Sequence, residues 1–152
     1  MRVADIMTRS VLVVGPRAPV PEIARLMWQH RVSGVPVVDE GRVIGIVTEL
    51  DLLVRNARLH WPTYVRVLDA LIPLGNPRRW DEEIRRALGT VAEDVMSRPV
   101  ITIRSDADVA DAATLMLDKR VNPLPVVDDG RLVGIVSRAD FVRLLAQDVP
   151  ID

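Results

Sequence analysis

GIVTELDLL, residues 45–53, is the stretch that decides the fold, because the chain repeats it 89 positions later as GIVSRADFV, residues 134–142. In both copies an apolar run predicts a buried strand, which ends at a hydroxyl residue, Thr48 or Ser137. An acidic residue three places on, Asp51 or Asp140, then falls in the first turn of a predicted helix. The chain is therefore built on an internal duplication.

The duplication continues without a gap on both sides of this stretch, so that residues 94–143 match residues 5–54. Each copy predicts a short strand, an amphipathic helix, a hairpin of two strands around a Gly-containing turn, and a second helix, which is an α/β (α+β) fold. In the first copy these elements are expected at residues 11–14, 20–30, 35–38, 42–47 and from residue 48 onward. In the second copy the first strand falls at 100–103, the helix at 108–119, the break after it at 122–125 and the hairpin turn at 128–130. Because a unit of about 50 residues buries too little surface to be stable alone, the two copies are expected to share one interface.

The chain divides into a first repeat at residues 1–54, an insert at 55–90, a second repeat at 91–145 and a tail at 146–152. In the insert, the spacing of the apolar residues predicts two amphipathic helices. The first follows Pro62 and carries Tyr64, Val67, Leu68, Leu71 and Ile72 on one face, and the second spans residues 77–88. Their apolar faces must be covered either by the repeats or by another chain.

The composition argues against several classes of protein and site. The net charge is −1 and the charged residues are spread along the chain, which disfavours nucleic-acid binding, although the pairs Arg78-Arg79 and Arg85-Arg86 keep it as a minor alternative. The chain has no Cys and two His, so neither a disulfide nor a metal site is expected. No apolar segment is long enough for a signal peptide or a membrane span, and we therefore expect a cytoplasmic protein.

Three motifs occur once in each copy and in the same order: Asp-x-Met at 5–7 and 94–96, Pro-Val-Val-Asp at 36–39 and 125–128, and Gly-x-x-[Ser/Thr]-x-x-Asp at 45–51 and 134–140. Together they resemble a tandem pair of CBS domains, also called a Bateman module, here of the stand-alone bacterial type. The resemblance implies two repeats with pseudo-twofold symmetry, two clefts and frequently a homodimer. It also implies an adenosine-containing ligand such as AMP, ADP, ATP or S-adenosylmethionine. The insert at 55–90 departs from the short linker of the family.

The resemblance implies roles for the residues that match the family motifs. Asp51 and Asp140 would accept hydrogen bonds from the ribose hydroxyls, and Thr48 and Ser137 would donate to a phosphate. The start of a helix favours an anion, because its free N–H groups and its dipole present positive charge. The adenine pockets would be lined by Ser33, Val35, Pro36, Asn122, Leu124, Pro125, Val13, Val14, Thr102 and Ile103.

The same pairs, Thr48 with Asp51 and Ser137 with Asp140, also fit a capping box. In that motif the hydroxyl and the carboxylate bind backbone N–H groups of their own helix, and no ligand is needed. The copies differ in the residue after the hydroxyl, which is Glu49 in the first and Arg138 in the second. We therefore expect the second cleft to bind an anion more strongly, and Arg138→Glu to weaken nucleotide binding more than Glu49→Arg.

Two functions follow from these observations. The first is a regulatory module that senses an adenosine-containing ligand, as in energy sensing, and signals by a conformational change. The alternative is a ligand-free scaffold for dimerisation or protein interaction. An enzyme is not expected, since there is no Gly-rich phosphate loop, no Cys nucleophile and no His near a matched Ser and Asp. With no enzyme or transporter domain fused to the repeats, the output is expected to pass to a separate protein partner, with no covalently bound cofactor and no membrane.

Overall fold

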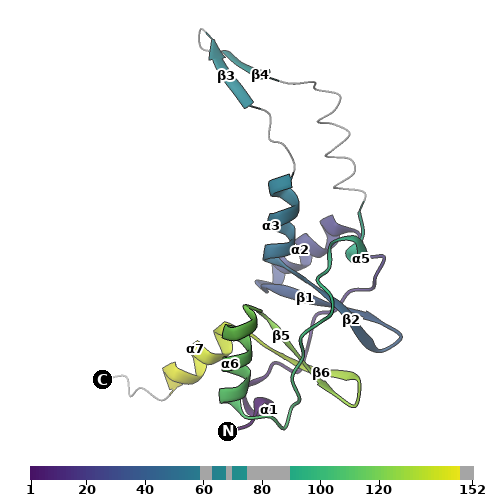
Figure 1. Ribbon diagram of the computed structural model, residues 1–152, viewed down its shortest axis with the longest axis vertical. Coiled ribbons are helices and arrows are strands. Elements are labelled where there is room, and N and C mark those ends of the chain that lie inside the picture. The colour runs from purple at the N-terminus through teal and green to yellow at the C-terminus, as the bar shows by residue number, and fades with distance from the viewer. Residues whose placement is uncertain (59–62, 68–69, 75–89, 148–152) are drawn as a thin grey trace.

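The computed structural model describes residues 1–58, 63–67, 70–74 and 90–147, and Figure 1 shows the two repeats side by side. The first repeat contains α1 (Val3–Ile6), α2 (Val20–His30), β1 (Gly34–Asp39), β2 (Arg42–Thr48) and α3 (Glu49–Arg58). The second contains α5 (Ala92–Val95), α6 (Val109–Lys119), β5 (Leu124–Asp128), β6 (Arg131–Val136) and α7 (Arg138–Gln147). The predicted α+β fold with two equivalent repeats is confirmed.

Each repeat is centred on an antiparallel hairpin, β1–β2 or β5–β6, as predicted. Both hairpins close with a two-residue turn whose central residues have positive φ: Glu40 (49°) and Gly41 (79°) in one, Asp129 (49°) and Gly130 (78°) in the other. Such turns match the right-handed twist of the strands they join, and an acidic residue followed by glycine favours them. The turn residues therefore fix where each hairpin forms.

The short strands predicted at residues 11–14 and 100–103 are wrong in length, because each is reduced to a single bridging residue. The Val14 N–H donates to Pro36 O at 3.1 Å, and Val14 O accepts from the Val38 N–H at 2.9 Å. This parallel ladder stops there because its next bond would need an N–H from Pro36, and proline has none. Ile103 bridges β5 in the same way beside Pro125.

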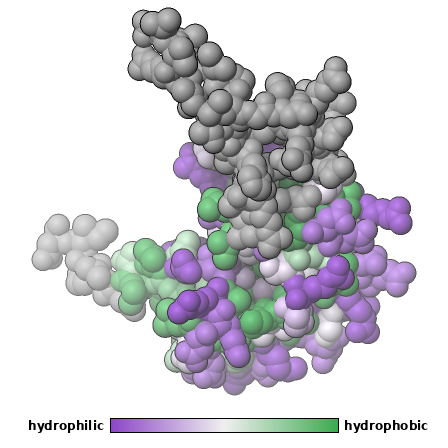
Figure 2. Space-filling view, turned by 45° about the horizontal axis from the view of Figure 1, so that its top comes forward, coloured by the Kyte–Doolittle hydropathy of each residue, from purple (hydrophilic) through white to green (hydrophobic). Residues whose placement is uncertain are grey.

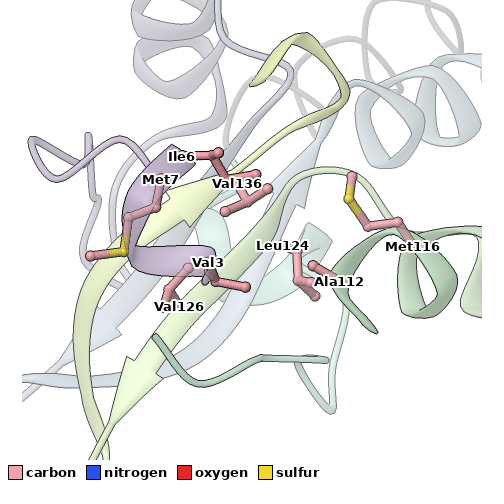
Figure 3. Close-up of a cluster of buried hydrophobic side chains, with 8 residues drawn as sticks. All are labelled: Val3, Ile6, Met7, Ala112, Met116, Leu124, Val126 and Val136. Atoms are coloured by element: carbon pink, nitrogen blue, oxygen red, sulfur yellow. The ribbon is translucent and has the colours of Figure 1, made fainter. Parts of the chain in front are cut away.

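The opening segment of each repeat packs in the hydrophobic core of the other repeat. Val3, Ile6 and Met7 form one cluster with buried residues of the second repeat, namely Ala112, Met116, Leu124, Val126 and Val136 (Figure 3). Ala92 and Met96 lie in the other cluster with buried residues of the first repeat, namely Val14, Ile23, Met27, Val35, Val37 and Val47. Neither core is complete without the other repeat, so the exchange joins both repeats into one module.

Backbone hydrogen bonds hold this exchange symmetrically. Thr8 pairs with Ile135 in β6, and the equivalent Ser97 pairs with Ile46 in β2. The N–H and carbonyl groups bond in both directions, at 2.9 Å for Thr8 with Ile135 and at 2.8 and 3.2 Å for Ser97 with Ile46. These reciprocal pairs give the module its pseudo-twofold symmetry.

The glycine that opens the repeated stretch makes room for the exchanged segment. A Cβ atom on Gly45 would overlap the side chain of Met96, and one on the equivalent Gly134 would overlap that of Met7. Only a residue without a side chain lets the opening segment of the other repeat lie this close to the hairpin. Glycine at this position therefore admits the exchange.

The insert differs from the prediction in its described part. Residues 63–67 and 70–74 were expected within one helix, but they form β3 (Thr63–Val67) and β4 (Ala70–Leu74), an antiparallel hairpin that lies beyond the far end of α3 (Figure 1). The single helical face of Tyr64, Val67, Leu71 and Ile72 is therefore wrong. The β-branched and aromatic residues of β3 favour a strand, and Pro73 would interrupt a helix. Leu68 and the second expected helix, at 77–88, lie outside the described residues. No helix in the described part of the chain has the length and hydrophobicity to cross a membrane.

Candidate ligand-binding clefts

Two cavities open at the helix starts that the duplicated stretch creates. The first cleft, of ≈ 260 Å³, lies at the start of α3 and is lined by Thr48 and Asp51. The second cleft, of ≈ 320 Å³, lies at the start of α7 and is lined by Ser137 and Asp140. The second volume is at the lower end of the range of about 300–1,000 Å³ that is usual for small-molecule sites, and the first is slightly below it.

Each cleft combines the helix start of one repeat with the opening segment of the other. The first cleft is completed by residues of the second repeat: Ser97, Pro99, Val100 and Ile101. The second cleft is completed by residues of the first repeat: Thr8, Ser10, Val11 and Leu12. The exchange therefore builds both clefts, and neither repeat supplies all the walls of one.

The carboxylate of Asp51 caps its own helix through one oxygen. Its Oδ2 accepts from the Thr48 N–H at 2.8 Å and from the Thr48 hydroxyl at 3.0 Å. The Asp51 N–H in turn donates to Thr48 Oγ1 at 3.3 Å, which completes the capping box. The other oxygen, Oδ1, accepts from the Ser97 hydroxyl at 2.6 Å. Asp51 is therefore held by the second repeat as well as by its own.

Asp140 caps its helix through Oδ2 in the same way, but its own N–H donates to the carbonyl Ser137 O at 3.0 Å rather than to the hydroxyl, and its Oδ1 has a different partner. Its Oδ2 accepts from the Ser137 N–H at 2.7 Å and from the Ser137 hydroxyl at 3.1 Å. Its Oδ1 accepts from Arg143 at 2.8 Å, and the same guanidinium nitrogen donates to Ile6 O at 2.9 Å. Asp140 is only 5% exposed, so its charge is buried. Arg143 thus links this carboxylate to the exchanged opening segment.

The capping box and the ligand site are not alternatives in this geometry. In both repeats Oδ2 satisfies the helix start, whereas Oδ1 depends on one side-chain donor, Ser97 or Arg143. A carboxylate offers about four acceptor positions, and neither Asp uses all of them within the described residues. Both aspartates line a cleft, so a hydroxyl group that displaced the donor at Oδ1 would bind there while Oδ2 kept its cap.

Ser33 and Asn122 meet between the two clefts and line both of them. They occupy equivalent positions in the two repeats, and Asn122 Nδ2 donates to Ser33 Oγ at 3.2 Å. The Arg138 N–H donates to Asn122 Oδ1 at 3.0 Å, which ties the start of α7 to this pair. The pair therefore marks the pseudo-twofold axis.

A family model described as the CBS domain matches residues 3–57 and 91–147. The chain belongs to the CBS domain family. It is 32% identical over 156 residues to the uncharacterized protein MJ1426 of Methanocaldococcus jannaschii, a match that covers 95% of this chain and 91% of that protein. It is 30% identical over 153 residues to the chloroplastic CBS domain-containing protein CBSX2 of Arabidopsis thaliana, covering 95% of this chain and 63% of that protein.

Solved structures of CBS proteins share the fold. The crystal structure of CBSX2 in complex with AMP has a TM-score of 0.71 and 30% identity, and the match covers 96% of each chain. The CBS domain pair of protein MJ0100, in complex with 5′-methylthioadenosine and S-adenosyl-L-methionine, has a TM-score of 0.74 and 26% identity over 98% of each chain. The resemblance to a tandem CBS pair is confirmed.

The structure places several residues that were expected in the adenine pockets of the CBS pair outside both clefts. Val35, Pro36, Leu124 and Pro125 are fully buried in the two cores. Val14 is also a core residue, Ile103 packs against the core, and Val13 and Thr102 are exposed. Because Val14 and Ile103 bridge the hairpins, the segment before each bridge faces the cleft instead: Val11 and Leu12 in one, Val100 and Ile101 in the other.

Two arginines in the clefts were not predicted. Arg31 lines the second cleft and the equivalent Arg120 lines the first. Both end a helix in the left-handed conformation, with φ of 53°. Glycine is the usual residue at such a position, and another residue there costs about 1 kcal/mol. The sequence signal was the recurrence of an arginine directly after the helix in both repeats, whereas its strained conformation, which is common at ligand sites, is visible only in the structure.

Proposed function

We propose that the chain is a regulatory CBS module that binds an adenosine-containing ligand in its clefts and signals by a change in packing between the repeats. The observation that carries the proposal is the pair of open clefts, each with an aspartate at a helix start. It is supported by CBSX2, which is 30% identical to this chain over 96% of its length and whose structure contains AMP.

The cleft residues have the chemistry that such a ligand needs. A ribose hydroxyl can replace Ser97 at Oδ1 of Asp51, or Arg143 at Oδ1 of Asp140, while each Oδ2 continues to cap its helix. The N–H groups and hydroxyls at the starts of α3 and α7 can then donate to a phosphate. Arg120 and Arg31 add one cation to each cleft.

Ligand binding in the second cleft has a direct route to the packing of the repeats. Arg143 donates to both Asp140 and Ile6 O, so a ribose that displaces it from the carboxylate also disturbs its bond to the exchanged segment α1. A ligand shifts a conformational equilibrium only if it binds the two states with different affinity. Competition for Asp140 provides that difference.

We also propose that the module forms a homodimer through its helices. Trp28 on α2 is 85% exposed, and the equivalent Leu117 on α6 is 77% exposed. Leu53 on α3 and the equivalent Val142 on α7 are exposed as well, and Figure 2 shows hydrophobic residues among hydrophilic ones on the surface of the repeats. Apolar residues at equivalent places on both repeats suit a twofold interface.

The alternative function, a scaffold that binds no ligand, is favoured by one observation: in both repeats the carboxylate caps its own helix start without a ligand. Thermal unfolding with AMP, ADP, ATP and S-adenosylmethionine separates the two functions. A ligand at 100 times its Kd stabilises the folded state by about 2.7 kcal/mol, and each kcal/mol raises the Tm of a chain of this size by about 2–4 °C.

Substitutions of the two aspartates test whether the ligand binds in the clefts. Asp51→Asn and Asp140→Asn each keep one oxygen for the cap, and we expect either to reduce the ligand-induced rise in Tm. Asp118→Asn, the same change on the exposed surface of α6, is the matched control and should keep the full rise. If no adenosine ligand raises the Tm of the unchanged protein, the scaffold function is the correct one.

A further inference from the structure

The two clefts are adjacent and share part of their walls. Five residues line both of them: Ser33, Glu49, Asn122, Pro123 and Arg138. Ser33 and Asn122 are equivalent positions of the two repeats, and so are Glu49 and Arg138. The clefts therefore meet at the pseudo-twofold axis, where each lies within reach of the helix start of the other.

The partition between the clefts is thin and tightly packed. The Ser33–Asn122 hydrogen bond crosses it, the Arg138 N–H donates to Asn122 Oδ1, and the Glu49 N–H donates to Ser33 O at 3.0 Å. A Cβ atom on Gly34 would lie 2.5 Å from Cδ of Pro123, so the ring of Pro123 packs directly on the backbone of Gly34. The first residue of each helix, Glu49 or Arg138, lines both clefts, so a ligand in either one lies beside the start of both helices.

Charge is distributed unequally across this partition. In the first cleft Arg120 and Asp51 offset each other, whereas in the second Asp140 is already paired with Arg143, so that Arg31 adds a positive charge there. The remaining charged residues are the shared pair, Glu49 and Arg138. Both are exposed, and neither side chain forms an ion pair within the described residues. The two clefts thus have one further cation between them.

We propose that this shared pair lets the module hold only one anionic adenosine ligand per chain, and that the other cleft then accepts an adenosine ligand without a phosphate. This inference rests on the proposed function. The first phosphate to bind uses Arg138. A second phosphate then finds Glu49 and the first phosphate nearby, and like charges at such a boundary oppose binding. A neutral ligand such as 5′-methylthioadenosine meets no such repulsion.

Isothermal titration calorimetry on the full chain tests this proposal with AMP and 5′-methylthioadenosine as probes. We expect one AMP per chain, with any second site weaker by at least about tenfold, which is within the range of typical coupling between sites. We expect 5′-methylthioadenosine to bind twice to the free protein and once to the AMP-saturated protein. Two equal AMP sites in the unchanged chain would overturn the proposal.

Glu49→Arg is the decisive variant, because it gives each helix start its own arginine. We expect it to raise the stoichiometry from one AMP to two. Glu22→Arg makes the same change of charge on the exposed surface of α2 and should still bind one. If Glu49→Arg binds one AMP, or if Glu22→Arg binds two, the shared-charge account is wrong.

A second variant covers the case in which Glu49→Arg does not fold. Arg138→Gln keeps the backbone N–H that bonds to Asn122, and we expect it to weaken AMP binding by about tenfold or more while leaving 5′-methylthioadenosine unchanged. Equal weakening of both probes would overturn the proposal. If neither probe binds the unchanged protein, the proposed function itself fails, and that result is distinct from two equal AMP sites.

Discussion

At the scale of single residues, Asp51 and Asp140 show why part of the site was predictable and part was not. Their caps involve Thr48 and Ser137, three positions away, so the pattern could be recognised locally. The partners of the other carboxylate oxygen, Oδ1, could not be predicted from the sequence. Ser97 is 46 positions from Asp51 and reaches it only because the opening segments are exchanged. Arg143 stands where the first repeat has Val54, and its bond to Asp140 has no counterpart there.

The close contact between Gly45 and Met96 gives a prediction at the same scale. We expect Gly45→Ala to destabilise the fold by about 1–3 kcal/mol, because the new Cβ would overlap the Met96 side chain. In a Met96→Ala background the same change should cost much less, so a double-mutant cycle should show coupling between the two positions. Denaturant unfolding measures each free energy.

Gly15→Ala serves as the control for this cycle, because a Cβ on Gly15 meets nothing within 4 Å. It should be neutral or slightly stabilising, since alanine restricts the unfolded chain more than glycine does. Additive effects of Gly45→Ala and Met96→Ala would show that the glycine has no packing role.

At the scale of elements, those with local signals were predicted and those set by distant contacts were not. The helices α2 and α6 have periodic apolar residues, and the hairpins have their turn residues, so their positions are confirmed. The insert was misassigned because Tyr64, Val67, Leu71 and Ile72 satisfy helical spacing, although the segment is also rich in residues that favour strands. The exchange of α1 and α5 could not be predicted, because the repeated glycines at 45 and 134 that admit it do not indicate which segment packs against them.

One pair of hydrogen bonds between distant segments is expected to stabilise the fold less at low pH. Asp128, at the end of β5, accepts from the Ser105 hydroxyl at 2.5 Å and from the Ser105 N–H at 3.0 Å. The hydroxyl first and the N–H second hold the pKa of Asp128 below its ordinary value. The stabilisation is therefore complete above the pKa of the unfolded chain, about 3.9, and is lost as the pH falls through the lower pKa of the folded protein.

We expect Asp128→Asn and Ser105→Ala to be less stable than the unchanged protein at pH 7, and this difference to shrink as the pH falls below about 4. Urea unfolding across the acid range measures the difference. Asp39→Asn is the matched control, because the first repeat has Pro16 in place of Ser105 and proline offers neither donor. If the difference in unfolding free energy between variant and unchanged protein stays constant with pH, ionisation of Asp128 is not the cause of the lost stability.

At the scale of the whole molecule, the exposed helices bear on assembly. If α2 and α6 face a second copy, Trp28→Glu should place a charge in the interface and convert dimer to monomer, with a rise in the dissociation constant of at least about tenfold. Sedimentation velocity measures the change. Val13→Glu, which alters an exposed apolar residue away from these helices, should leave the assembly intact. A chain that is monomeric without any substitution contradicts the proposed dimer.

The exchange of α1 and α5 between the repeats also suggests how a chain with two repeats could arise. A protein with a single repeat would have an incomplete hydrophobic core and an unpaired opening segment. Two copies of it could complete each other's cores by exchanging these segments. Joining two genes end to end would turn that swap between molecules into one within a molecule without changing a contact. Such a fusion would leave Met7 in the core of the second repeat and Met96 in the core of the first, as observed.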